Sequence, residues 1–216
     1  GLSALEAMWP GYWSYARRAT GIDPLSAEPS GRQVVLLAEL RGWADDALRD
    51  ALLEAAGRLM EVGLVLDAAL AASEAQAERF WRLREANAEL YRHFPHLLGF
   101  DLSIDPGRME DLIAGVAASL AAPQEALWFG HMGDANLHLA VTGVDAAAAK
   151  DVKRRVYDAV RDLEGSVSAE HGIGAEKLDW LGHTRTAAEI ALMRSLRTLL
   201  DPNGIMNPGR TVPPAV

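Results

Sequence analysis

The sequence predicts an α+β fold in which helices pack on an antiparallel or mixed sheet. Segments with helical spacing of apolar residues are interspersed with short β-rich runs, and two neighbouring runs form a clear hairpin. This hairpin breaks the strict alternation of strand and helix that a parallel α/β sheet requires. Two β-α-β-like halves further indicate ferredoxin-like units that share a sheet.

The individual elements follow from the spacing of apolar residues and from the positions of glycine, proline and capping residues. Helices are expected at 1–20, 44–63, 73–94, 106–121, 145–165 and 186–202. Strands are expected at 33–40, 64–71, 100–105, 126–132, 136–143 and 166–174. Residues 21–32 form a turn-rich link.

The composition excludes several classes of protein. At 216 residues, half of them hydrophobic, the chain can bury a real core, and no apolar run approaches the roughly 20 residues of a membrane span. The absence of cysteine rules out disulfides, thiolate metal sites and cysteine catalysis, and fits a cytoplasmic protein. The net charge of −9 and the lack of a basic cluster argue against a nucleic-acid partner.

Two of the six histidines, His131 and His138, flank the predicted turn of the hairpin. A loop at 134–135 makes them opposed cross-strand partners, with Cβ atoms about 4.5–5.5 Å apart. Alternation along the second strand turns its leucines toward the core and leaves the histidines on the other face. Two imidazoles so placed can bind one metal ion. The alternative is a solvated hairpin with two polar residues.

A second candidate is the segment SAEHGIGAEK, residues 168–177. Glu170 and His171 would point to opposite sides of a strand and could serve a metal and a substrate separately. Gly172 and Gly174 permit a sharp turn, but without a third glycine they are not a dinucleotide fingerprint. The alternative places Glu170 near the start of a helix.

A third candidate is Arg84, on a helix that is half apolar. Its guanidinium could clamp a carboxylate through two parallel hydrogen bonds. A surface ion pair with Glu85 or Glu89 explains the same pattern. On the residues alone, both interpretations stay open.

Three segments, in the order FGHMGDANLHL, SAEHGIGAEK and LDPNGIMNPGR, resemble the carboxy-terminal domain of FAD-linked oxidases of the vanillyl-alcohol-oxidase superfamily. The chain is similar to the D-2-hydroxyacid dehydrogenase branch, with D-lactate dehydrogenase, the glycolate oxidase flavoprotein subunit and D-2-hydroxyglutarate dehydrogenase. The similarity covers nearly the whole chain, including FWRLRE in place of LWRLRE. It implies oxidation of a 2-hydroxy acid to the 2-oxo acid, with hydride transfer to flavin.

The resemblance also implies roles for individual residues. His131, His138 and Glu170 would bind a divalent metal, and this ligand set suits zinc while remaining compatible with manganese or iron. His171 would be the base that takes the proton of the substrate hydroxyl.

Three further roles are implied in the same way. Arg84 would hold the substrate carboxylate. Asn207 and Gly209, in the segment NPG, would lie near the flavin. The partners would then be a small 2-hydroxy acid, an amino-terminal FAD-binding domain and an electron acceptor of unknown identity; a homodimer is an open alternative.

The sequence departs from the family pattern at several positions. Ala135 stands where the family usually has glycine. Ala88, Gly99 and Ala140 stand where 2-hydroxyglutarate dehydrogenases have a threonine, a lysine and an asparagine that help to bind the substrate. These changes favour a smaller or more apolar acid, such as lactate or glycolate.

Nothing in the sequence corresponds to the glycine-rich phosphate loop of the family's FAD-binding domain. We therefore expect residues 1–216 to be the substrate- and metal-binding domain, with 1–32 a helical lead-in from the flavin domain and 175–216 a helical tail ending in NPG. We expect the chain alone to bind little FAD and to show no turnover. The aromatic-rich residues 9–15 would be interface left uncovered, and an electron acceptor could bring the cytoplasmic protein to a membrane surface.

Two other functions fit the same residues. One is a stand-alone oxygenase that uses a two-histidine, one-carboxylate metal site, which would need iron and a cosubstrate. The other is a non-catalytic domain that keeps the fold without the reaction. The presence of every implied ligand favours the dehydrogenase over the non-catalytic domain.

Overall fold

The computed structural model describes residues 1–43 and 45–213. The chain divides into two compact units, Gly1–Leu97 with Leu127–Asp134, and Leu98–Ala126 with Ala135–Val216. Both units combine helices with antiparallel strands, which confirms the α+β class. Among the described residues no helix has both the length and the apolar character that crossing a bilayer requires.

The first unit is built around strand β1 (Leu2–Met8). This strand pairs in antiparallel fashion with β2 (Val35–Leu40) on one side and with β4 (Glu125–His131) on the other. The helical elements of this unit are α1 (Pro10–Thr20), α2 (Asp45–Glu61), α3 (Glu74–Arg84), the 3-10 helix η1 (Glu85–Glu89) and α4 (Leu90–His93). Helix α3 packs against both α1 and β2.

The predicted helix over 1–20 is wrong for residues 2–8 and confirmed from Pro10 onward. The run LSALEAM consists largely of helix-forming residues, so local propensity favours a helix. Its place between β2 and β4 supplies backbone hydrogen bonds that override this preference. Pro10 occupies the first turn of α1, where its missing N–H costs nothing.

The aromatic residues of this region form core rather than uncovered interface. Trp9, Tyr12, Trp13 and Tyr15 are all buried, with Tyr12 0% and Trp13 1% exposed. The ring of Tyr12 lies 4.4 Å from that of Phe129, centroid to centroid. The expectation that these residues were left bare by an absent domain is therefore wrong.

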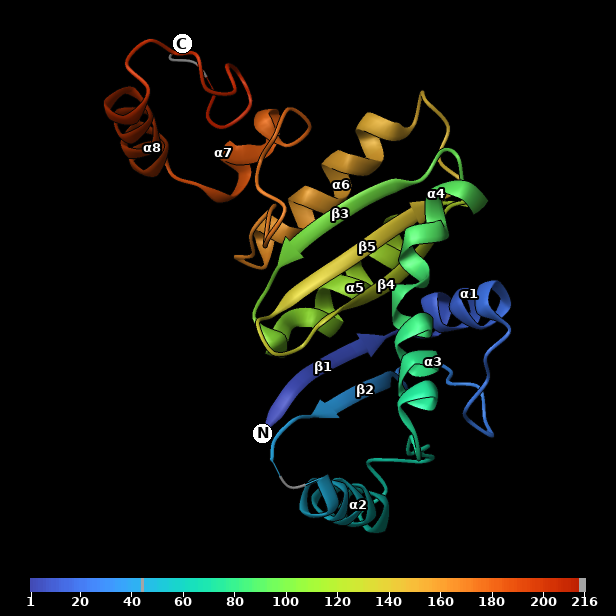
Figure 1. Cartoon of the computed structure of the whole chain (residues 1–216). Coiled ribbons are helices and arrows are strands. Elements are labelled where there is room, and N and C mark those ends of the chain that lie inside the picture. Colours follow the sequence, from blue (N-terminus) through green and yellow to red (C-terminus); the bar gives the residue numbers. More distant parts are fainter. Residues whose placement is uncertain (44, 214–216) are drawn as a thin grey trace. The chain divides into compact units, whose positions relative to one another are not determined.

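The second unit pairs β3 (Leu98–Ser103) with β5 (Asn136–Thr142) in antiparallel fashion (Figure 1). Helix α6 packs on β3 and on α5. The helical elements of this unit are the 3-10 helix η2 (Pro106–Arg108), α5 (Met109–Ser119), α6 (Ala149–Asp162), the 3-10 helix η3 (Leu178–Trp180), α7 (Leu181–Thr184) and α8 (Ala187–Leu200). All of the predicted helices of this unit are present, with shifted ends.

Strand β5 is buried on both faces, which corrects the expected alternation of core and open faces. Leu137, Leu139 and Val141 are at most 1% exposed, as predicted for the core face. The opposite face is covered as well, since His138 is only 7% exposed. The strand register places Asp101 of β3 directly across from His138.

Two predicted strands are absent from the described residues. Residues 64–71 have no regular structure, and Asp67 there accepts hydrogen bonds from the backbone N–H and the hydroxyl of Ser26 instead. Residues 166–174 contribute one bridge, from Ser166 to Ser103, before the chain turns away. In both places the β-rich run lacks a neighbouring strand along its length.

The turn between β4 and β5 covers residues 132–135 and holds Ala135 in the left-handed region, with φ of 61°. An L-residue with a Cβ atom pays about 1–2 kcal/mol for this conformation, whereas glycine adopts it freely. This strain gives a physical reason why glycine would be favoured at this position. The direct opposition of His131 and His138 across the hairpin stays a prediction.

The strain at Ala135 can be measured. We predict that Ala135→Gly raises the free energy of unfolding by about 1 kcal/mol, because glycine removes the left-handed penalty. The matched control is Ala114→Gly at an exposed position inside α5, which should lower it by about 0.5–1 kcal/mol. Urea denaturation checks both values, and a loss of stability at Ala135 equal to that at Ala114 would contradict the assignment.

Candidate functional site

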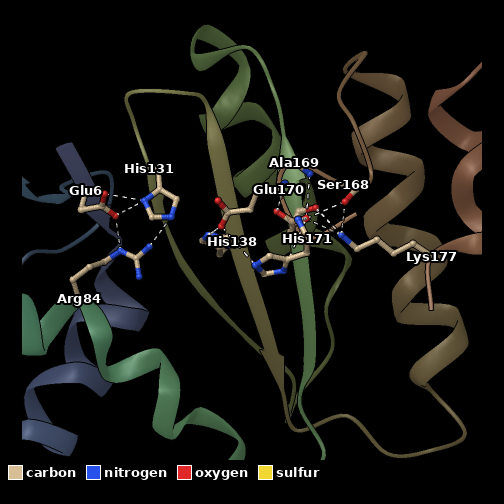
Figure 2. Close-up of polar contacts among 10 residues, drawn as sticks. Glu6, Arg84, His131, His138, Ser168, Ala169, Glu170, His171 and Lys177 are labelled. Carbon is tan, nitrogen blue, oxygen red and sulfur yellow. Dashed lines mark hydrogen bonds and ion pairs between the residues drawn. The ribbon is translucent and has the colours of Figure 1, made fainter. Parts of the chain in front are cut away.

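In the first unit, Glu6, Arg84 and His131 form one polar cluster (Figure 2), in which Glu6 and Arg84 are buried and His131 is half-buried. The carboxylate of Glu6, on β1, is 5% exposed and accepts a hydrogen bond of 2.7 Å from Nε of Arg84. Nδ1 of His131 lies 2.8 Å from the same carboxylate. Arg84 therefore pairs with a distant carboxylate and not with its neighbours Glu85 or Glu89.

The contacts of His131 define which of its ring nitrogens carries hydrogen. Nη2 of Arg84 lies 3.3 Å from Nε2 of His131, and a guanidinium can only donate. Nε2 is therefore the acceptor, and Nδ1–H donates to Glu6. A carboxylate that fixes a histidine through one ring nitrogen is the common arrangement behind a metal-binding imidazole. The nitrogen with ligand character is then Nε2.

Two further contacts hold Arg84 in place. The guanidinium lies over the ring of Phe129, with Cζ 4.9 Å from the ring centroid. The Tyr12 hydroxyl donates a 2.6 Å hydrogen bond to the Arg84 carbonyl oxygen and accepts one of 2.9 Å from the backbone N–H of Asn87. Burial raises the pKa of Tyr12 far above its usual range, against the opposing charge of Arg84, so the phenol remains a donor.

In the second unit, His138, Glu170 and His171 come together (Figure 2). Asp101 belongs to the same cluster. Nε2 of His138 lies 3.4 Å from Oε1 of Glu170, and Nε2 of His171 lies 3.6 Å from the same oxygen. The two imidazoles are stacked, with centroids 5.5 Å apart and 21° between their planes. His138 is buried, whereas the side chain of His171 is 63% exposed and accessible to a small molecule.

Asp101 lies behind this cluster and organises the loop that carries it. Its carboxylate accepts hydrogen bonds from three consecutive backbone N–H groups, those of Ala169, Glu170 and His171, at 3.0–3.2 Å. Nζ of Lys177 donates to the same carboxylate at 2.9 Å. The side chain of Asp101 is only 2% exposed.

The protonation state of Asp101 follows from these contacts. Burial alone would raise the pKa of the carboxyl. The hydrogen bond from Lys177 and those from the backbone of His171 and Glu170 outweigh it and hold the pKa well below its usual range. Asp101 is therefore a permanent anion beside the candidate metal ligands.

The residues of the second unit fit a divalent metal in their chemistry. One ligand atom from each of Asp101, His138, Glu170 and His171 can be chosen so that all four lie within 4.8 Å of one another. Nitrogen and carboxylate oxygen together suit zinc and related divalent ions. Of the three predicted metal ligands, the structure brings His138 and Glu170 together here and places His131 with Glu6 and Arg84.

The two residues predicted to lie near the flavin belong to the irregular end that follows α8. Asn207 and Gly209 are exposed and have positive φ, 46° and 67°. The backbone around them is tied to α8, because Nη2 of Arg197 donates to the Met206 carbonyl oxygen at 2.7 Å. Their role toward the flavin stays a prediction.

Sequence reasoning missed three polar residues of these clusters: Glu6, Asp101 and Lys177. Glu6 lies in the segment predicted to be helical, and Asp101 opens the DLS strand without a recognised role. One signal was available, since a charged residue within an apolar strand run usually has a buried partner. The identity of each partner comes only from the fold.

The hydrogen position on His131 yields a test. We predict that the neutral imidazole of His131 carries its proton on Nδ1 in the metal-free chain, and that Glu6→Gln shifts it toward Nε2 because the charged acceptor is lost. Long-range ¹H–¹⁵N correlation spectra distinguish the two tautomers. The control Glu78→Gln, on the exposed face of α3, should leave the spectrum unchanged. A wild-type His131 protonated on Nε2 would contradict the assignment.

Comparisons with known proteins identify the family of the chain. The family model for FAD linked oxidases, C-terminal domain, matches residues 1–211. A D-2-hydroxyglutarate dehydrogenase of Xanthomonas citri pv. viticola is 41% identical over 177 residues, which are 77% of this chain and 37% of that protein. One from Stutzerimonas stutzeri is 37% identical over 161 residues, which are 70% of this chain and 34% of that protein. The mitochondrial D-2-hydroxyglutarate dehydrogenase of Bos taurus is 36% identical over 159 residues, which are 72% of this chain and 29% of that protein.

The chain thus spans about a third of the length of these curated relatives. The match to the family model covers nearly the whole sequence, and it includes both clusters described above. The chain belongs to the family of FAD-linked oxidase C-terminal domains.

Proposed function

We propose that this chain is the substrate- and metal-binding part of an FAD-dependent dehydrogenase that oxidises a D-2-hydroxy acid to the 2-oxo acid. The observation that carries the proposal is the cluster of His138, Glu170 and His171, two imidazoles and a carboxylate on the family's own motifs. The names of the relatives support the same class of reaction.

A divalent cation, preferably zinc, would be held by His138 and Glu170 and, on the evidence of the hairpin motif, by His131. When bound, it would orient the substrate through its hydroxyl and carboxylate oxygens and lower the pKa of the hydroxyl. The tautomer of His131 supports its part, because Glu6 takes Nδ1, so that Nε2 becomes the ligand atom once its contact with Nη2 of Arg84 is released.

The proton of the C2 hydroxyl would go to the imidazole of His171. This ring is exposed on one side and stacked on His138 on the other, so it can reach a substrate bound at the cluster. An imidazole titrates near neutral pH and is suited to this role. A bound flavin would supply the acceptor for the hydride of C2, so that loss of the hydroxyl proton to His171 and of this hydride gives the 2-oxo acid and reduced flavin.

Arg84 would bind the substrate carboxylate. Its Nε is occupied by Glu6, while the Nη edge of the guanidinium extends beyond that ion pair. The contacts of the guanidinium with Glu6 and His131 use Nε and Nη2. A planar guanidinium held by a buried carboxylate and an aromatic ring is preorganised for a second carboxylate.

The substrate would be a small 2-hydroxy acid such as D-lactate or glycolate. Gly99 and Ala140 are paired in the β3–β5 register, two residues along from the Asp101–His138 pair and on the same face. The Gly99–Ala140 pair offers no polar side chain that could bind a second carboxylate of the substrate. Ala88, in η1, likewise offers none. The relatives' names make D-2-hydroxyglutarate the acid for direct comparison.

The remaining parts of the enzyme lie beyond this site. We propose that an FAD-binding domain completes it, with Asn207 and Gly209 close to the flavin and residues 1–32 leading in from that domain. A homodimer, the electron acceptor and a cytoplasmic location remain predictions.

His131 tests the proposed reaction. In the complete gene product, His131→Ala should lower kcat/KM for D-2-hydroxy acids by at least about 100-fold and lower the bound metal, since a ligand is lost. Steady-state kinetics and elemental analysis measure the two effects, and His96→Ala, an exposed histidine of the same unit, is the matched control.

Two outcomes would contradict the proposal. Full turnover in a metal-free His131→Ala protein would remove the metal from the reaction. Iron-dependent oxygen consumption with a cosubstrate, in place of 2-hydroxy acid oxidation, would support the stand-alone oxygenase instead.

A further inference from the structure

We infer that Asp101 is a positioning residue, whose buried carboxylate holds the backbone of residues 169–171 so that Glu170 and His171 face His138. The meaning of this inference for catalysis rests on the proposed function, because it takes Glu170 as a metal ligand and His171 as the base. The contacts themselves are independent of any ligand.

The carboxylate is the hub of the loop. Oδ1 of Asp101 accepts from the backbone N–H of Glu170, and Oδ2 accepts from those of Ala169 and His171. Successive backbone N–H groups that converge on one anion form a concave nest, which fixes the dihedral angles of the residues between them. The backbone of both candidate catalytic side chains is thereby fixed by one charge.

The β3–β5 register determines the position of the Asp101 carboxylate. Asp101 and His138 are directly opposed in the antiparallel pair, so any loop that wraps the carboxylate is brought to the imidazole. The result is the 3.4 Å approach of Glu170 Oε1 to His138 Nε2. It also produces the stacking of His171 on His138.

Lys177 binds the carboxylate of Asp101 and closes the loop around it. Its Nζ donates to Oδ2 of Asp101 at 2.9 Å, to the Asp101 carbonyl oxygen at 3.3 Å and to the Ser168 hydroxyl at 3.0 Å. Gly172 and Gly174 both have positive φ, 72° and 55°, and this reversal of the chain returns Lys177 to the carboxylate. The GIG motif thus has a conformational reason that needs no bound nucleotide.

The alternative is that Asp101 is itself a metal ligand, since it lies within the cluster of four. Its donors argue against this. Oδ2 already receives two backbone N–H groups and the ammonium of Lys177, which is more than its lone pairs accommodate, and the Ser168 hydroxyl lies 3.1 Å away. A cation there would compete with a fixed positive charge at 2.9 Å.

Hydrogen exchange of the backbone amides tests the inference without metal. In wild type, the amides of Ala169, Glu170 and His171 should exchange slowly. In Asp101→Asn they should exchange at least about 10-fold faster. The substitution replaces one carboxylate oxygen by an NH2 group, which cannot accept a hydrogen bond from the backbone N–H groups. The matched control is Asp105→Asn, an exposed aspartate of the same unit that caps η2.

Metal affinity forms the second readout. Competition with a chelator should show Asp101→Asn of the complete gene product binding zinc about 10–100-fold more weakly, the usual effect of an outer residue that orients ligands. The visible spectrum of the cobalt-substituted variant should keep the wild-type band positions, because the ligand set is unchanged. Lys177→Met should weaken zinc binding in the same direction, and Lys177→Arg should restore most of it.

Should Asp101→Asn fail to fold, Ser168→Ala serves as a milder variant, because it removes only the hydroxyl, which contacts Asp101, Lys177 and the Gly172 carbonyl oxygen. Its loop amides should exchange faster than in wild type. Unchanged amide exchange in a folded Asp101→Asn would overturn the inference. So would cobalt bands that shift while the amides stay protected, which would make Asp101 a ligand. If wild type binds no metal while the amides behave as expected, the proposed function fails and the positioning role stands.

Discussion

The geometry of the second unit depends on one buried anion, the carboxylate of Asp101. Taking a carboxylate out of water costs several kcal/mol, so it is tolerated only with strong partners. Three backbone N–H groups and Lys177 supply them, and each of these partners belongs to the loop that carries Glu170 and His171 or directly follows it. The same contacts that stabilise the charge therefore fix the loop beside His138.

The first unit uses the same device at another place. Glu6 is a buried carboxylate that binds the guanidinium of Arg84 on one side and the imidazole of His131 on the other. In each unit, a residue without a direct chemical role in the proposed reaction orients the residues that have one. Functional side chains that are held in this way lose little entropy when they bind a ligand.

The local features of the fold could be predicted from the sequence. Helices α2, α3 and α6 follow their apolar spacing. Strand β1 could not be predicted, because its residues favour a helix and only pairing with β2 and β4 makes it a strand. The run at 64–71 failed for the opposite reason, since β-forming residues without a partner strand stay irregular.

The candidate site divides in the same way. His138, Glu170 and His171 belong to recognisable motifs, so their joint appearance in one cluster was expected from the sequence. Glu6 and Asp101 lie far along the chain from the residues that they orient, and a single sequence contains no signal for such pairs. Lys177 is close in sequence to Glu170 and His171, but its partner Asp101 is distant. Ala135 lies between these two cases. The sequence shows an alanine where the family pattern predicts glycine, but the conformational strain of this alanine follows only from the positive φ of the turn.

X-ray absorption at the zinc edge, recorded on the zinc-loaded protein, would show whether His131 and His138 bind a cation. We predict scattering from two imidazole rings and a carboxylate at about 2.0–2.2 Å in wild type, and from one ring in His138→Ala. A spectrum without imidazole scattering, or one that His138→Ala leaves unchanged, would contradict the metal site.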